Sequence, residues 1–191
     1  MKRIPWLLLI SLCSTFAYGA NQSDLEKLIN FQKAQSSHVD LSHADLRNYI
    51  FVSSKIDLQQ ANLSYSNLSG VDLSKMNLSG ADLSYTDLSN AKLNQTILTD
   101  ANLNHANLSN AELQKSDFSR ANLSFANLMS AKLQQAMLAK ADLTCADLDQ
   151  ADLTQSNFTD TTISGASFVN TVTADIVGYE SVVDGKVGCE G

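Results

Sequence analysis

A leucine, or occasionally a phenylalanine or isoleucine, occupies every fifth position from Leu58 to Phe168, which gives 23 consecutive repeats. The residue two positions earlier is small, usually alanine, and the other positions are mostly polar, as in the segment 81–85 (ADLSY). Five residues turn an α-helix by about 500°, so the leucines would spread over every face. On a flat strand an odd step sends successive leucines to opposite faces. The chain must therefore turn about once per repeat, which predicts an all-β solenoid with the leucines inside.

The repeated unit of a small residue, Asp or Asn, Leu, Ser or Thr and a variable residue resembles the pentapeptide-repeat family over residues 39–170. The resemblance implies a right-handed quadrilateral parallel β-helix with four units, or 20 residues, per turn. Three earlier units centre on Leu41, Leu46 and Phe51, and the seven-residue step to Leu58 predicts a bulged corner near 52–55. The resulting 26 units would form about 6.5 turns, a rod of roughly 31 Å.

Deviations from the repeat recur every 20 residues and support a four-unit turn. Aromatic or His residues at the variable position form one set: Tyr65, Tyr85, His105 and Phe125. Lys and Glu residues at the Asn/Asp position form a second set, Lys92, Glu112 and Lys132, and Asp72 and Asp152 extend its column by one step at each end. Each set would stack in a column about 4.8 Å per step, and the two columns would lie on opposite sides of the rod.

The two columns invite different interpretations. The charges alternate in sign, so each side chain would have an attractive neighbour above and below, and we interpret this column as structural. The aromatic column is either a stacking ladder that stabilises the coil or a strip that binds sugar or an apolar segment of a partner.

The first 19 residues are typical of a secretory signal peptide, with Lys2 and Arg3 before a short apolar run and small residues near Gly19. The alternative is an N-terminal membrane anchor or a buried helix. Cleavage after Gly19 would change the net charge from −7 to −9 and leave no further segment long enough to span a bilayer. The sequence thus predicts an exported protein, in the bacterial periplasm or outside the cell.

Both ends of the repeat need a cover, because an open turn exposes leucines and unpaired backbone. Within residues 20–38, Ser23 and Glu26 form a capping box, which predicts a short helix over about 24–35 that covers the first turn. Residues 171–191 lack the five-residue period and predict a C-terminal strand or hairpin cap, or alternatively a homodimer contact.

Two cysteines, Cys145 and Cys189, remain after removal of the signal peptide. An even pair in an oxidising compartment favours a disulfide, and a tail that folds back by one turn would bring them together. The alternative is two unpaired thiols.

Catalytic chemistry is not visible in the sequence. His38, His43 and His105 lie without a Ser, Cys or Asp partner at catalytic spacing, and we expect no metal or cofactor site. The glycines at 70, 80 and 165 occupy the variable corner position and do not form a phosphate-binding loop. The protein is therefore expected not to be an enzyme.

Two functions compete. The first is a rigid, non-enzymatic interaction or scaffold module that binds a protein or envelope component, since the acidic charge argues against direct binding of nucleic acid or anionic lipid. The second rests on the resemblance: some family members are acidic DNA mimics that bind type II topoisomerases and confer quinolone resistance. The signal peptide and the lysines on the outer faces count against that second function.

Overall fold

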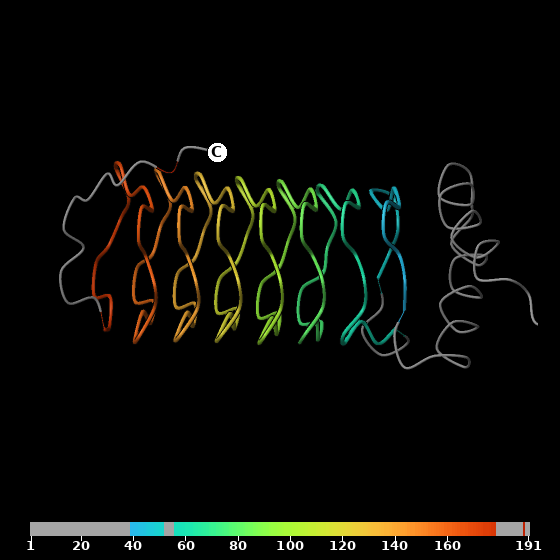
Figure 1. The fold of residues 1–191 in the computed structure, drawn as a ribbon, viewed down its shortest axis with the longest axis horizontal. Coiled ribbons are helices and arrows are strands. Elements are labelled where there is room, and N and C mark those ends of the chain that lie inside the picture. Colours follow the sequence, from blue (N-terminus) through green and yellow to red (C-terminus); the bar gives the residue numbers. More distant parts are fainter. Residues whose placement is uncertain (1–38, 52–55, 179–188, 190–191) are drawn as a thin grey trace, which may run out of the picture.

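The described chain is a coil whose turns stack along a single axis (Figure 1). A computed structural model describes residues 39–51, 56–178 and 189. This part of the chain contains no helix and no continuous strand, because successive turns are joined by isolated parallel bridges, from Asp40–Asn62 to Asn157–Val177. The all-β solenoid expected from the five-residue period is thus the observed architecture.

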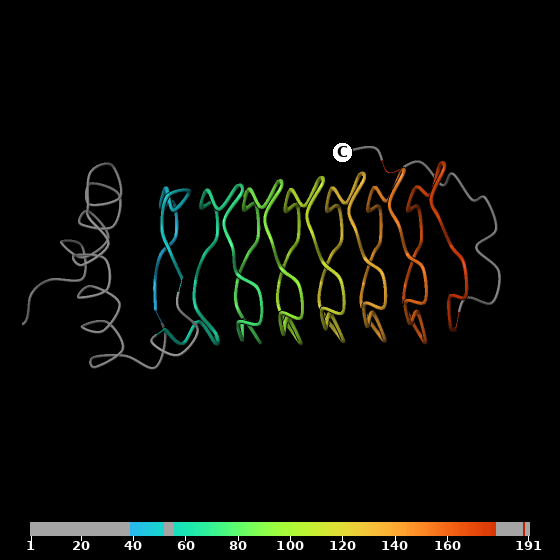
Figure 2. The same ribbon diagram turned by 180° about the vertical axis from the view of Figure 1, so that it is seen from behind.

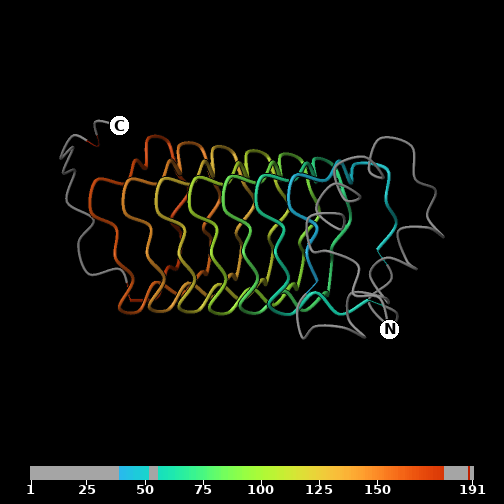
Figure 3. The same cartoon turned by 45° about the vertical axis from the view of Figure 1, so that its right-hand side comes forward.

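The bridges confirm the 20-residue turn. From residue 62 onward each bridging residue pairs with the residue 20 positions later, as Asp82 does with Asn102. In the first turn the separation is 22, because Asp40 pairs with Asn62 and Asp45 with Asn67. The pairing therefore keeps its register across the two extra residues, and the bulged corner expected near 52–55 lies outside the described residues. Figures 2 and 3 show that the turns beyond this point repeat with the same shape.

The interior is a continuous stack of the fifth-position side chains. Leucines from Leu41 to Leu153 are almost completely buried, and Phe118 and Phe158 take the same position in two turns. The alanines two positions earlier are also buried, as is Val71 at the same position. One large and one small residue per unit thus fill the narrow interior.

Some inward small positions carry a hydroxyl instead of a methyl group. Thr86 Oγ1 donates a hydrogen bond to the Leu63 carbonyl oxygen at 2.8 Å, and Ser116 Oγ donates to the Leu113 carbonyl oxygen at 2.6 Å. Because each buried hydroxyl has an acceptor, its burial is not penalised.

The last position of each unit forms a corner of the coil. Its side chain varies from unit to unit, whereas its backbone conformation is nearly constant. This residue has a positive φ at His43 and in every unit from Gln60 to Asp175, between 55° and 64° at the non-glycine positions. The preceding Asn or Asp helps to form the turn: Asp82 Oδ1, for example, accepts the backbone N–H of Ser84 at 3.0 Å. This Asx turn explains the preference for Asn and Asp at the bridging position.

The corner conformation makes a prediction at Asn90, an exposed residue with φ 58°. Asn90→Val is expected to destabilise the protein by about 1–2 kcal/mol, because a β-branched residue is strained in the left-handed region. Asn90→Gly is the matched control and is expected to cost almost nothing, since glycine adopts this conformation freely. Urea unfolding followed by circular dichroism measures both, and equal stabilities would contradict the assignment of strain to the corner.

The coil extends beyond the boundary expected at residue 170. Bridges join Asp152 to Val172 and Asn157 to Val177, so residues 171–178 continue the ladder. The sequence concealed this extension because Thr173 stands where a leucine is expected, whereas backbone pairing does not require that leucine. The expected signal peptide, the capping helix at 24–35 and most of the C-terminal cap lie outside the described residues.

Candidate interaction surfaces

The aromatic column consists of five parallel rings on one corner of the coil: His43, Tyr65, Tyr85, His105 and Phe125. Neighbouring ring centroids are 4.8–5.0 Å apart and the interplanar angles are 1–12°. His43 is a member that the sequence interpretation missed, because the two-residue insertion places it 22 positions before Tyr65. Allowing for the seven-residue step after Phe51 would have identified it.

The rings of the aromatic column present their edges to solvent. Each inner ring is covered on both faces by its neighbours, yet Tyr65, Tyr85 and Phe125 remain 53%, 47% and 42% exposed. An aromatic edge carries partial positive charge, and the hydroxyl and imidazole groups at these edges add polar contacts. The column is therefore a stacked ladder and an exposed strip at the same time.

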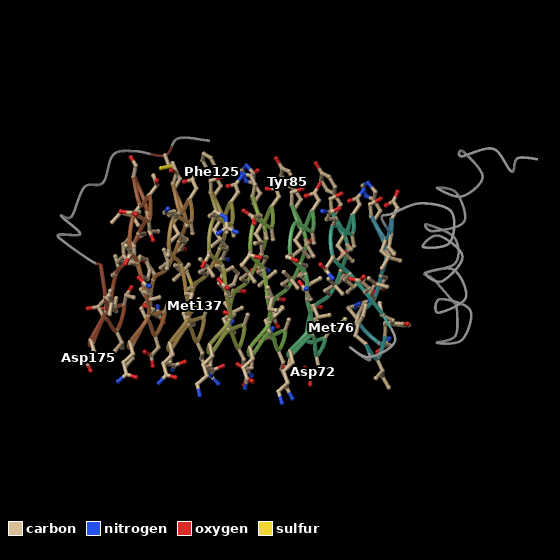
Figure 4. The ribbon with its side chains drawn as sticks, turned by 90° about the horizontal axis from the view of Figure 1, so that it is seen from below. Asp72, Met76, Tyr85, Phe125, Met137 and Asp175 are labelled. Carbon is tan, nitrogen blue, oxygen red and sulfur yellow. A yellow bond between two sulfur atoms is a disulfide. The ribbon has the colours of Figure 1, made fainter. Side chains whose placement is uncertain are left out.

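A disulfide lies at the C-terminal end of the aromatic column. Cys145 occupies the corner one turn after Phe125, where the next ring would stand, and it is bonded to Cys189 with a Cα–Cα distance of 5.7 Å. The Cys189 sulfur lies 3.6 Å from the Gly165 carbonyl oxygen, one turn further on. Figure 4 shows the disulfide in yellow on the same edge of the rod as Tyr85 and Phe125.

The charged column lies on another side of the coil, with one residue in each successive turn. Each member forms a parallel β-bridge with the next: Asp72, Lys92, Glu112, Lys132 and Asp152. Figure 4 shows Asp72 on the edge of the rod away from Tyr85. The sequence predicted that each charge would have an oppositely charged neighbour in the turns above and below it, but most of these neighbours do not form ion pairs. Among the described residues of the column, only Lys132 and Glu112 form an ion pair, at 3.3 Å.

Other groups replace the missing contacts in the charged column. The backbone N–H of Ser74 donates to Asp72 Oδ1 at 2.9 Å, and hydrogen bonding to Ser74 is the main reason that the pKa of Asp72 is lowered. The pKa of Glu112 is lowered chiefly by its hydrogen bond with Lys132. Asp152 accepts a hydrogen bond from Gln134 Nε2 at 2.6 Å.

A separate ion pair, between Arg120 and Asp100, lies on another corner of the coil. Arg120 binds Asp100 through two nitrogens, at 2.7 and 2.6 Å, one turn apart along the rod. The hydrogen bond from Arg120 holds the pKa of Asp100 below its usual value. Both side chains are more than half exposed, so this pair contributes modestly to stability.

Within residues 39–51 and 56–178 and at Cys189, no group of three or more His, Cys, Asp or Glu side chains could hold a metal ion. Nor does this part of the chain contain a helix long and apolar enough to cross a bilayer. His43 and His105, two of the residues considered for chemistry, are both stacked in the aromatic column.

Comparison with known families identifies the class of protein. The chain matches the family described as pentapeptide repeats, in eight copies, over residues 56–95, 96–135 and 136–172. The protein therefore belongs to the pentapeptide-repeat family, whose members form right-handed β-helices. The comparison with curated proteins returned no match.

Several solved structures are similar to this chain. Pentapeptide repeat protein Rfr23 from the cyanobacterium Cyanothece 51142 is 35% identical, covering 61% of this chain and 63% of its own, with a TM-score of 0.35. A pentapeptide repeat protein of the Arabidopsis thaliana thylakoid lumen is 32% identical, covering 56% and 71%, with a TM-score of 0.39. QnrB1, a plasmid-mediated fluoroquinolone resistance protein, is 16% identical, covering 75% and 80%, with a TM-score of 0.41. The match thus spans less than two thirds of the Cyanothece protein.

Proposed function

We propose that this chain is a non-enzymatic, exported interaction module that binds a protein partner along the aromatic column. The observation that carries the proposal is the exposure of this column: Tyr65, Tyr85 and Phe125 keep about half of their surface open although their faces are stacked. Contiguous exposed aromatic surface is typical of contact sites, and Tyr is enriched among residues that dominate binding energy.

The ring orientation favours a protein over a sugar. A sugar ring packs against an open aromatic face, whereas the inner rings Tyr65, Tyr85 and His105 are covered on both faces. Ring edges with hydroxyl and imidazole groups suit the side chains and backbone of a protein partner. The sugar alternative is thereby weakened, while the apolar-segment alternative gains support.

Export is supported by two features of different kinds. Residues 1–19 have the composition of a signal peptide, and the Cys145–Cys189 disulfide suits an oxidising compartment. Cell fractionation with N-terminal sequencing tests this part of the proposal. We expect a chain that begins near Ala20 in the periplasm or medium, and an intact chain in the cytoplasm would contradict export.

DNA mimicry of the quinolone-resistance type is the alternative, and the resemblance to the family and the acidic net charge of −7 favour it. A mimic of duplex DNA needs rows of negative charge, as on the phosphate backbone. Here the charged column alternates in sign, and Arg120 pairs with Asp100 on another corner. A cytoplasmic location, in the experiment just described, would favour the alternative.

The aromatic column is tested by the double substitution Tyr85→Ser and His105→Ser. We expect partner binding to fall by about thirtyfold, because two central contact residues each contribute more than about 1 kcal/mol. Quantitative pull-down from the envelope fraction measures the loss. The matched control changes Gln95 and Gln135 to Ser on another corner. If the aromatic variant only lowers the melting temperature and binds its partner normally, the column is a structural ladder.

The C-terminal end is the alternative place for contact with a second copy of the chain, which the resemblance to the family allows. The last described turn leaves Val169, Val172 and Val177 between 50% and 57% exposed. Ile163 and Phe168 are only partly buried there. A homodimer through this end would cover that apolar surface, as the sequence suggested.

A further inference from the structure

The side of the coil that carries the charged column differs in charge from the rest of the molecule. Of the two corners beside the charged column, the one that follows it in the sequence carries six exposed residues: Lys75, Gln95, Lys115, Gln135, Gln155 and Asp175. We call this the flanking corner. Together with the charged column, this corner contains four lysines and four acidic residues, so the formal charge of the side is zero. The whole chain carries −7. This side is therefore where two copies can approach with the least overall repulsion.

Most charges on this side form no ion pair with another described residue. Lys92 is exposed and has no carboxylate within 4.0 Å among the described residues, although Asp72 and Glu112 lie one turn away on either side. Asp152 accepts hydrogen bonds from Thr154 and Gln134 but forms no ion pair in the described chain. These charges are available to a partner.

We propose that this side is a self-complementary interface through which two copies of the chain pair antiparallel, with the twofold axis between the levels of Glu112 and Lys132. An antiparallel twofold reverses the order of levels in the second copy. Lys92 then faces Asp152 of the other copy, and Glu112 faces Lys132. On the flanking corner the same operation places Lys75 opposite Asp175, whereas Asp72, at the end of the charged column, faces Val172. Both columns thus form attractive pairs in this one register.

Other arrangements of two copies are unfavourable. Parallel copies related by a twofold would set every charge of the column against its own equivalent. An antiparallel axis at the level of Glu112 would set Lys92 against Lys132. An axis between the levels of Lys92 and Glu112 also brings opposite charges of the column together. It places Lys75 opposite the neutral Gln135, however, and so loses the contact between Lys75 and Asp175.

The spacing explains why the partner is a second copy. Charges that alternate at about 4.8 Å per step match a surface with the same step, and an extended peptide instead repeats about every 6.6–6.8 Å on one face. Another coil of this chain has the required step at every level. The proposal uses a different side from the aromatic column, so either can fail without the other.

Charge reversal at Lys92 and Asp152 gives a sharp test. The two residues are three turns apart in one chain, about 14 Å, which exceeds the Debye length of about 8 Å at physiological salt. Their coupling therefore reports on contact between copies. We expect the wild-type protein to sediment as a dimer at low salt, and Lys92→Glu or Asp152→Lys alone to weaken association at least tenfold. The double variant is expected to restore it.

Mixing the Lys92→Glu and Asp152→Lys variants provides a second test of the interface. In a mixed pair Glu at 92 faces Lys at 152, and the native Asp152 faces Lys92, so both contacts are attractive. We therefore expect a heterodimer from two variants that are monomeric alone. Lys140→Glu, an exposed change of the same charge on another corner, is the matched control and should leave the dimer intact. Circular dichroism verifies that each variant is folded.

Three results would overturn the proposal. The first is a monomeric wild type at low salt. The second is a dimer that Lys92→Glu does not weaken, as expected if association occurs through Val169 and Val177 at the C-terminal end. The third is a dimer broken by the single reversals and restored neither in the double variant nor in the mixture.

Discussion

Replacing Phe118 with alanine is expected to lower the free energy of unfolding by about 3–5 kcal/mol. Phe118 takes the place of a leucine in the central stack and is completely buried. Its removal leaves a cavity between Leu98 and Leu138, one turn away on each side, and a coil held by backbone pairing between turns cannot readily collapse to fill it. Urea unfolding followed by circular dichroism measures the loss.

Phe125→Ala is the matched control for this experiment. The deleted side chain is the same, but Phe125 is 42% exposed and stands at the end of the aromatic column, where it stacks on His105 alone among the rings. Its removal is expected to cost only about 1 kcal/mol, the value of one stacked aromatic contact. Equal losses for the two phenylalanines would contradict the assignment of Phe118 to the interior and Phe125 to the surface.

Removing the disulfide is expected to have the second large effect. The bond between Cys145 and Cys189 closes a loop across 44 residues, so replacing both with serine should destabilise the enclosed turns by about 4 kcal/mol on the chain-entropy account. Thermal unfolding in the absence of reductant compares the variant with the wild type. The loss is expected in the last turns first, since a solenoid is stabilised turn by turn.

Reductant supplies the control for the disulfide. Reduced wild type should unfold like the double serine variant, and the variant itself should be insensitive to reductant. Mass spectrometry of the non-reduced protein should show both thiols blocked. Free thiols at both positions, or identical unfolding of oxidised wild type and variant, would contradict the bond.

The repeat made the backbone predictable but left the side-chain arrangement open. A strict five-residue period fixed which residues face inward, and the 20-residue recurrences correctly placed Tyr85 near His105 and Lys92 near Glu112. Sequence spacing gives the level of each Cα, whereas contacts also depend on side-chain rotamers. This is why Lys132 reaches Glu112, whereas Lys92 reaches no carboxylate in the described part of the chain.

Positions where the repeat changes were the hardest to interpret. His43 was left out of the aromatic column because its spacing to Tyr65 is 22. Residues 171–178 were excluded from the coil because Thr173 interrupts the apolar period, although Val172 and Val177 still pair with the turn before. Departures in side-chain type do not break a structure that is held by hydrogen bonds between backbone groups.

Because each bridging residue pairs with the one 20 positions later, insertions and deletions in such a protein preserve the sides of the coil only when they span whole turns. Loss of five residues would rotate everything beyond the deletion by a quarter turn and scatter the outer columns, whereas loss of 20 keeps every side in place. Even a 20-residue loss would bring Lys92 next to Lys132, because the charges repeat only after 40. The double turn is therefore the smallest segment whose duplication or deletion preserves the alternation of sign in the charged column.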